Sequence, residues 1–160
     1  MFFWGAKWRI VVNIKKIIDG DEELSDGYEN IKSIVGIGEL GAIVLLHLFL
    51  KYPDANKKQI ISLVGLDPTR FDSGSSVHKK SKISKAGAKL YRGVLFMGAM
   101  MATRCNTEMK LFYDRLKENG KQTTQAQIAV MRKMITIAHS LYKNKQKYNS
   151  DMYQKACGML

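Results

Sequence analysis

Acidic residues, cysteines and long apolar stretches are all scarce in this 160-residue sequence. The two cysteines, Cys105 and Cys157, exclude a disulfide scaffold, and their small number suits a reducing cytosol. The longest apolar stretch, Ala42–Leu50, contains His47 and is shorter than the ~20 residues that a membrane-spanning helix needs. The apolar opening Met1–Trp4 is followed by basic residues, which is the wrong order for a secretory signal. We therefore expect no membrane partner.

The shortage of acid lies beyond residue 30. The whole chain has 26 Lys and Arg against 14 Asp and Glu, a formal net charge of +12. Residues 1–30 hold four basic and six acidic residues, so residues 31–160 hold 22 and eight, a net charge of +14. Residues 78–92 contain six basic residues and no acid. This field favours a nucleic acid as partner over a basic face that serves only solubility. An anionic membrane surface is a weaker alternative, because the basic run does not form a clean amphipathic helix.

Helical periods dominate the second half of the chain. Spacings of four, three and four residues predict a helix whose apolar stripe consists of Leu90, Val94, Met97 and Met101. We expect Ser84 to cap this helix, because serine is a preferred N-cap residue. The methionines in these helices are expected to fill the core.

Two further helices are predicted after it. A short helix, capped by Asn106 or Thr107, ends at Asn119-Gly120. A capping box at Thr124–Gln127 begins a long final helix. The stripes that predict them are Met109, Phe112 and Leu116, and then Ile128, Met131, Ile135, Ala138 and Tyr142.

Shorter elements are predicted in the first half. They are an amphipathic turn at 29–34, an apolar helix at 40–50 and a short helix at 56–64. Residues 67–84 have no apolar period and predict a loop of about 17 residues, a length that suggests function. Residues 8–12 are the one segment with a strand-like period. With 46% hydrophobic residues the chain can bury a core, so the sequence predicts one all-α domain.

Two patterns suggest chemistry. The first is Gly36-Ile37-Gly38, between two predicted helices. Two glycines allow a tight hairpin whose amides, with the start of the next helix, can hold a phosphate. A helix-hairpin-helix motif uses this arrangement to follow the DNA backbone without reading sequence. The alternative is an ordinary turn between helices.

The second pattern is the serine-rich loop with its lysines. Ser73, followed by Gly74, could attack a phosphodiester if a base or metal removed its proton and cations stabilised the charge on phosphorus. No base is evident in the motif, so the alternative is a flexible loop that contacts phosphate or solvent. The candidate phosphate contacts in and after this loop are Arg70, Gly74, Lys79, Lys80, Lys82, Lys85, Lys89 and Arg92.

Other chemistry is not indicated. The three histidines, His47, His78 and His139, are far apart and lack ligand partners at zinc spacing. The acidic residues at 19–23 fit a solvated turn better than a metal site. The sequence has no P-loop, Rossmann or Gly-x-Ser-x-Gly pattern.

An ordered series of short motifs resembles the C-terminal transposase domain of the IS110 class of insertion sequences, which are relatives of the Piv-type DNA invertases. The resemblance covers about residues 21–148. Its motifs are Ser33-Ile34-Val35-Gly36-Ile37-Gly38, Gly65-Leu66-Asp67-Pro68 with Ser73-Gly74, Ile83-Ser84-Lys85-Ala86-Gly87, Leu90-Tyr91-Arg92 with Leu95-Phe96-Met97, Phe112-Tyr113-Asp114-Arg115-Leu116 with Gly120-Lys121, and Arg132-Lys133.

The resemblance implies a role that composition could not give. In this family a helical domain bears a serine nucleophile, here Ser73, which forms a transient phosphoserine link to DNA. A RuvC-like domain with four acidic ligands and magnesium completes the site, so no cofactor is expected on this chain. The implied partners are DNA, a structured guide RNA from the element and further copies of the protein. The implied location is the bacterial cytoplasm, in association with the nucleoid.

The chain departs from the family pattern at three places. Val35 stands where proline is usual, and Glu39-Leu40-Gly41 replaces the usual proline and small hydroxyl residue. Nothing in residues 1–30 has the length of a RuvC-like domain, so we interpret the chain as a truncated transposase that is inactive alone.

The predicted organisation has three parts. An unassigned segment at 1–20, interpreted as foreign or frameshifted, precedes the helical domain at 21–148, and a tail follows at 149–160. Within the domain we expect a helix-hairpin-helix-like motif, a long basic loop and a three-helix C-terminal part. The alternatives are a non-catalytic helix-hairpin-helix-type binding module and a protein-interaction bundle with incidental charge.

Overall fold

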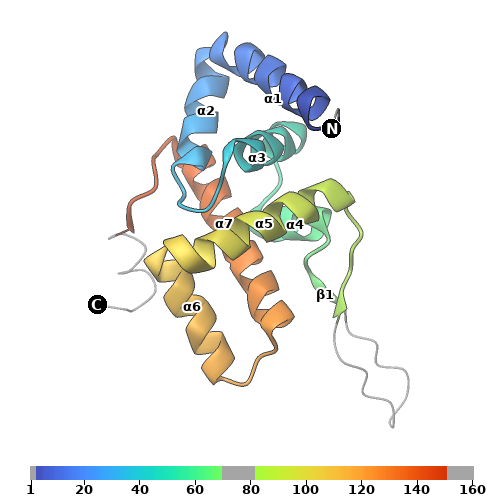
Figure 1. Ribbon diagram of the computed structural model, residues 1–160, viewed down its shortest axis with the longest axis vertical. Helices are drawn as coiled ribbons and strands as arrows, with labels where there is room; N and C mark the ends of the chain where they lie inside the picture. Colours follow the sequence, from blue (N-terminus) through green and yellow to red (C-terminus); the bar gives the residue numbers. More distant parts are fainter. Residues whose placement is uncertain (1–2, 70–81, 151–160) are drawn as a thin grey trace.

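The computed structural model describes residues 3–69 and 82–150, with side chains from residue 9 (Figure 1). Helices dominate these residues, which confirms the all-α fold and the three-helix C-terminal part. The elements are α1 (Phe3–Asp19), α2 (Glu22–Lys32), α3 (Glu39–Lys51), α4 (Lys57–Val64), β1 (Pro68–Thr69), β2 (Lys82–Ile83), α5 (Lys89–Cys105), α6 (Thr107–Glu118) and α7 (Thr123–Asn144). Within the described residues, no helix combines the length and apolar character needed to cross a membrane.

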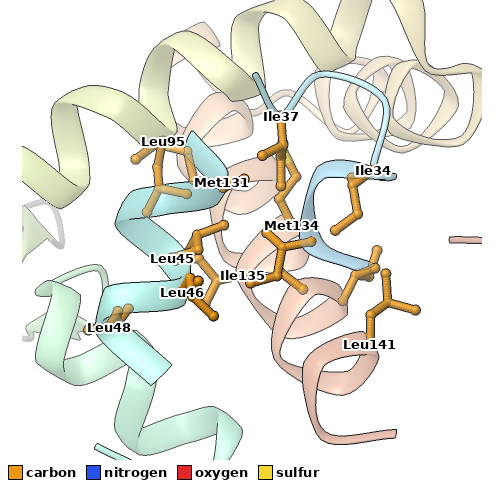
Figure 2. Packing of buried hydrophobic residues seen from close by; sticks show 14 of the residues in the cluster. Ile34, Ile37, Leu45, Leu46, Leu48, Leu95, Met131, Met134, Ile135 and Leu141 are labelled. Atoms are coloured by element: carbon orange, nitrogen blue, oxygen red, sulfur yellow. The ribbon is translucent and has the colours of Figure 1, made fainter. Parts of the chain in front are cut away.

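The core is built around α3 and α7. Helix α3 is apolar almost all round because α1, α2, α5 and α7 all contact it. Figure 2 shows Leu45 and Leu46 of α3 meeting Met134 and Ile135 of α7. The buried residues of α3 are Ala42, Ile43, Val44, Leu45, Leu46, Leu48 and Phe49. This helix matches the predicted one closely.

Local sequence signals set most helix ends. The Asp21 carboxylate caps α2 by accepting from the Leu24 amide at 3.0 Å. Asn56 and Gln59 form a capping box at α4, and Gly65 ends that helix in the left-handed conformation, at φ +75°. The Asn106 side chain caps α6 by accepting from the Met109 amide at 3.1 Å. The predicted starts and ends of α4 and α6 are therefore confirmed.

Helix α1 includes residues 8–12, the one segment with a strand-like period. Their β-branched residues favour a strand locally, but a helical stripe of Val11, Ile14 and Ile18 packs against the core, and this tertiary contact decides the outcome. Helix α2 is also longer than the predicted turn at 29–34.

Two predicted caps are wrong. Helix α5 begins at Lys89, after Ala88, and the Ser84 hydroxyl donates to the Asp67 carboxylate instead. Helix α7 begins at Thr123, where the Gln122 amide donates to Gln125 Oε1 at 3.3 Å, two residues before the predicted box.

The apolar stripe predicted to bury α5 is largely exposed. Leu90 and Met97 are both 61% exposed and Met101 is 49% exposed. Helix α5 packs instead through Leu95, Ala99 and Ala102, a second stripe one residue further along. Its two alanines let the hairpin and α7 approach closely. Met97 and Met101 therefore do not fill the core, whereas Met131 and Met134 of α7 are buried in it.

A polar cluster attaches the segment after α7 to the hairpin and to α6. The Tyr148 amide donates to Ser33 Oγ at 2.8 Å, and its hydroxyl donates to Glu108 Oε2 at 2.9 Å. The Asn106 side-chain amide lies 3.4 Å from the Tyr148 hydroxyl and 3.5 Å from the Val35 carbonyl. This cluster explains how Glu108 can be buried.

Candidate nucleic-acid interface

A short antiparallel ribbon closes the base of the basic loop. Strands β1 and β2 pair Pro68 with Ile83 and Thr69 with Lys82. The Thr69 hydroxyl also donates to the Lys82 carbonyl at 2.9 Å. The ends of the loop that carries Ser73 are thus fixed side by side.

The ribbon rests on the end of α4. Lys85, in the left-handed conformation at φ +56°, donates its amide to the Gly65 carbonyl at 3.0 Å, and Ser84 donates its amide to the Asp67 carbonyl at 2.9 Å. A Cβ on Gly87 would lie 1.9 Å from the Leu63 carbonyl oxygen, so only glycine fits there. The Gly-Leu-Asp-Pro motif therefore positions the loop.

Arg92 holds the same junction from α5. Its Nη1 donates to the Val64 carbonyl at 3.0 Å and to the Gly87 carbonyl at 2.6 Å, and the side chain is half-buried. Charge-assisted bonds to two carbonyls attach α5 to both α4 and the ribbon. Arg92 has a structural role here, and its predicted phosphate contact stays a prediction.

Three of the predicted basic residues are exposed beside this junction. Lys82, Lys85 and Lys89 form none of the ion pairs found within the described residues. Their charges are therefore available to an anionic partner. The candidates Arg70, Ser73, Gly74, Lys79 and Lys80 lie outside the described residues.

The Gly-x-Gly hairpin is used mainly for packing. Gly36 has φ +105°, and a Cβ there would lie 2.6 Å from the Ala102 Cβ of α5. Ile37 is buried and donates its amide to the Ile34 carbonyl at 2.9 Å (Figure 2). Only Gly38 is exposed, with no atom near its Cβ position. These contacts explain the first glycine without a ligand.

Charged groups surround the start of α3. Glu39 Oε1 lies 3.6 Å from Lys15 Nζ and 3.8 Å from Lys32 Nζ. A carboxylate here is favoured by the helix dipole, but it also repels a phosphate. Burial, and then Glu39, raise the pKa of the Tyr28 hydroxyl, which lies in the core nearby. The Glu39 carboxylate thus lies beside the hairpin between two lysines, and the predicted phosphate contacts of Gly36, Ile37 and Gly38 stay a prediction.

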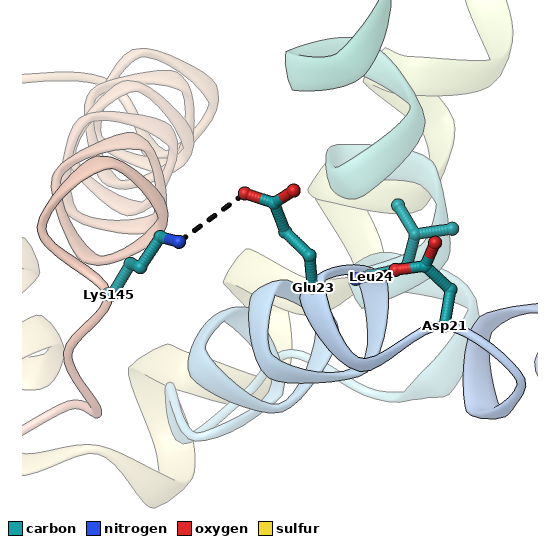
Figure 3. A network of polar contacts seen from close by, with 4 residues as sticks. All are labelled: Asp21, Glu23, Leu24 and Lys145. Atoms are coloured by element: carbon teal, nitrogen blue, oxygen red, sulfur yellow. Dashed lines mark hydrogen bonds and ion pairs between the residues drawn. The ribbon is translucent and has the colours of Figure 1, made fainter.

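The acidic turn before α2 has ordinary structural partners. Glu23, in the first turn of α2, forms an ion pair at 3.4 Å with Lys145, at the end of α7, and the Asp21 cap lies beside it (Figure 3). In the part of the chain that the structure describes, no group of three His, Cys, Asp or Glu residues is placed to hold a metal.

The two described histidines differ sharply. His47 is exposed on α3, where its Nδ1 lies 2.9 Å from the Tyr91 hydroxyl of α5. His139 is buried against Phe49, and burial, and then Lys143, lower its pKa. The His47–Tyr91 pair joins residues 44 positions apart, so sequence reasoning missed it.

The exposed stripe of α5 forms one wall of an apolar groove. The groove has a volume of about 870 Å³, and residues 36–41 of the hairpin and α3 form its opposite wall. The expected core stripe thus lines a surface feature next to the hairpin.

Comparison with known proteins shows that the chain is similar to members of a transposase family. A model described as the transposase IS116/IS110/IS902 family matches residues 28–114, which include the hairpin, the ribbon and α5. The pilin gene-inverting protein of Moraxella bovis is 30% identical over 146 residues, which cover 88% of this chain and 44% of that protein. The insertion element IS110 uncharacterized 43.6 kDa protein of Streptomyces coelicolor is 28% identical over 123 residues, 75% of this chain and 30% of that one. The chain therefore spans less than half the length of these curated relatives.

Proposed function

Since this chain belongs to the IS116/IS110/IS902 transposase family, we propose that it is the DNA-binding, serine-bearing half of a transposase or site-specific recombinase. The observation that carries the proposal is the closed base of the loop that contains Ser73. The ribbon, Gly65 and Arg92 fix both loop ends. Three lysines that form no ion pair with another described residue lie beside them. This arrangement suits a loop that must meet a phosphate backbone in a defined position.

The reaction we propose is transesterification. The Ser73 oxygen forms a bond to a DNA phosphorus, and the bond from phosphorus to the leaving deoxyribose oxygen breaks. The serine proton passes to a base, and the leaving oxygen takes up a proton. In the second step a hydroxyl of the partner strand attacks the phosphoserine and releases the serine. The lysines would stabilise negative charge on the phosphate oxygens.

Magnesium does not fit the described residues of this chain. None of their acidic clusters can hold a metal, so we assign no step to it here. We propose that a RuvC-like acidic domain, a structured RNA and further copies of the protein complete the active complex.

The test is formation of a covalent protein–DNA adduct. The chain is mixed with donor and target DNA, Mg²⁺, the element's RNA and a separately supplied RuvC-like domain from a relative. We expect an adduct that Ser73→Ala abolishes and Ser76→Ala, a matched change in the same loop, leaves intact. An adduct that persists in Ser73→Ala would overturn the assignment of the nucleophile. An adduct formed without the added acidic domain would overturn the proposed requirement for that domain.

A non-catalytic binding module is the second candidate. The absence of an evident base in the Ser73 motif favours it. It predicts duplex binding that falls steeply with salt and no adduct even with the acidic domain present. In both cases the triple variant Lys82→Ala/Lys85→Ala/Lys89→Ala should weaken duplex binding and flatten the slope of log Kd against log salt by about 3. A protein-interaction bundle would show neither effect.

A further inference from the structure

A second polar site lies at the opposite end of α5 from the ribbon. A cavity of about 360 Å³ opens between the C-terminal half of α5, helix α6 and the start of α7. None of the residues predicted from the sequence to bind DNA lines it. Its walls combine cations, hydroxyl groups, one amide and two aromatic rings, those of Phe96 and Tyr113.

The strongest sign of a ligand is Gln127. This side chain lines the cavity and is only 6% exposed. Its Nε2 is buried and makes no hydrogen bond. Buried amide donors in native proteins nearly always have an acceptor, so this group points to one that a ligand supplies.

The charges around the cavity favour an anion. Arg104 and Lys110 line it and take part in no ion pair within the described residues. Asp114 is the one carboxylate in the lining, so the charged side chains sum to +1. The start of α7, with the Thr124 hydroxyl, adds the positive end of a 22-residue helix.

The cavity is too large for a phosphate alone, and one wall is aromatic. Phe96 is 38% exposed there and lines the cavity, which Tyr113 also lines. Bases of single strands stack on such rings and form hydrogen bonds through their edges with polar side chains. A base, sugar and phosphate together match the ring, the Gln127 amide and the two cations.

We propose that this cavity binds one unstacked nucleotide of a single-stranded nucleic acid, with its phosphate at Arg104 and Lys110 and its base between Phe96 and Gln127. The choice of nucleic acid rests on the proposed function. The cavity would give the protein a contact with single strands that is separate from the basic loop.

The test measures binding of labelled oligonucleotides to the full chain. Single-stranded RNA, single-stranded DNA and the matched DNA duplex are compared by fluorescence anisotropy, with adenosine monophosphate as competitor. We expect Arg104→Ala/Lys110→Ala to weaken single-strand binding by ~10-fold while duplex binding changes by less than about 2-fold, because two phosphate contacts are lost. Lys121→Ala, an exposed cation outside the cavity, is the matched control.

Two further variants separate recognition from folding. Gln127→Leu removes the unpaired amide, and Phe96→Leu removes an exposed ring. We expect both to weaken single-strand binding by ~5-fold without lowering Tm, and Phe96→Leu to reduce quenching of a 2-aminopurine base in the oligonucleotide. A Gln127→Leu protein with raised Tm and unchanged binding would show an unused polar group and overturn the proposal.

The outcomes also separate this site from the proposed function. In one outcome duplex binding depends on salt, but none of the three variants changes single-strand binding. This result overturns the proposed nucleotide site and leaves the transposase proposal standing. Failure to bind any nucleic acid overturns both. If the protein binds adenosine monophosphate but no single strand, the proposed contact with a single-stranded nucleic acid is wrong. A preference for RNA or for DNA strands supports the proposal and identifies the ligand.

Discussion

Helices α3 and α5 both carry several apolar residues, but α3 is the more apolar of the two and is buried to a greater extent. Helix α3 buries seven residues against α1, α2, α5 and α7, whereas α5 buries three and exposes Leu90, Met97 and Met101. The hairpin contacts α5 closely along its small residues. The comparison teaches that α3 mainly stabilises the fold. Helix α5 also contributes residues to three surface features, which are the ribbon junction, the apolar groove and the polar cavity.

The largest expected effect tests this contrast directly. Phe49→Ala in α3 removes a ring that is 1% exposed and lies 5.3 Å from His139 and 5.4 Å from Tyr142 between ring centres. We expect it to lower the free energy of unfolding by about 3–5 kcal/mol. Met97→Ala in α5, the matched truncation, should change it by less than about 0.5 kcal/mol, because the side chain is already exposed. Urea denaturation measures both, and equal losses would refute the contrast.

The second effect concerns the contact between the hairpin and α5. Gly36→Ala places a Cβ against Ala102 in a backbone conformation that suits glycine, so we expect a loss of about 2–3 kcal/mol. Gly38→Ala is the matched control, because that residue has φ −83° and open space, and it should cost well under about 1 kcal/mol.

A double variant tests the side-chain part of this contact. Gly36→Ala/Ala102→Gly removes the Ala102 Cβ but leaves the new Cβ 2.8 Å from the Ala102 N and Cα atoms, so thermal unfolding should show only slight recovery. No difference between the two glycine variants would mean that the hairpin does not pack tightly on α5.

The same contrast shows what sequence reasoning could achieve. Helix α4 was predictable to its ends because its signals are local: a capping residue at Asn56 and a glycine at Gly65. The buried face of α5 was not, because both stripes, the exposed one through Met97 and the buried one through Ala99, are apolar and only tertiary packing chooses between them.

The candidate site divides in the same way. The exposed Lys82, Lys85 and Lys89 could be found by charge alone. The structural role of Arg92 could not, because it depends on carbonyls 28 and five residues away. The polar cavity also combines three helices, and no spacing in the sequence signals the unpaired amide of Gln127.

The third prediction uses neighbouring cations of α5. Arg92→Ala removes two hydrogen bonds from a charged donor and leaves the Val64 and Gly87 carbonyls without it, so we expect a loss of about 1–3 kcal/mol. Lys89→Ala should leave stability unchanged within about 0.5 kcal/mol and weaken DNA binding instead. Chemical denaturation and DNA titration of both variants check this division. If Lys89→Ala destabilised the protein as much as Arg92→Ala, the division between structural and binding cations would be wrong.

The smallest expected effect concerns His139 of α7, which is buried against Phe49 of α3. The folded-state pKa of His139 is lowered, because burial and Lys143 disfavour its charged form. Its contribution to stability is therefore fully present above the unfolded pKa, about 6.5, and is lost as pH falls from there through the lower folded pKa. We expect His139→Leu to flatten this part of the stability–pH curve. Thermal unfolding of His139→Leu and wild type measures the difference. The series runs from about pH 7.5, about one unit above the unfolded pKa, to about pH 4.5, about two units below it. The same pH dependence in His139→Leu and wild type would contradict the assignment, because the proton uptake on unfolding would then come from another group.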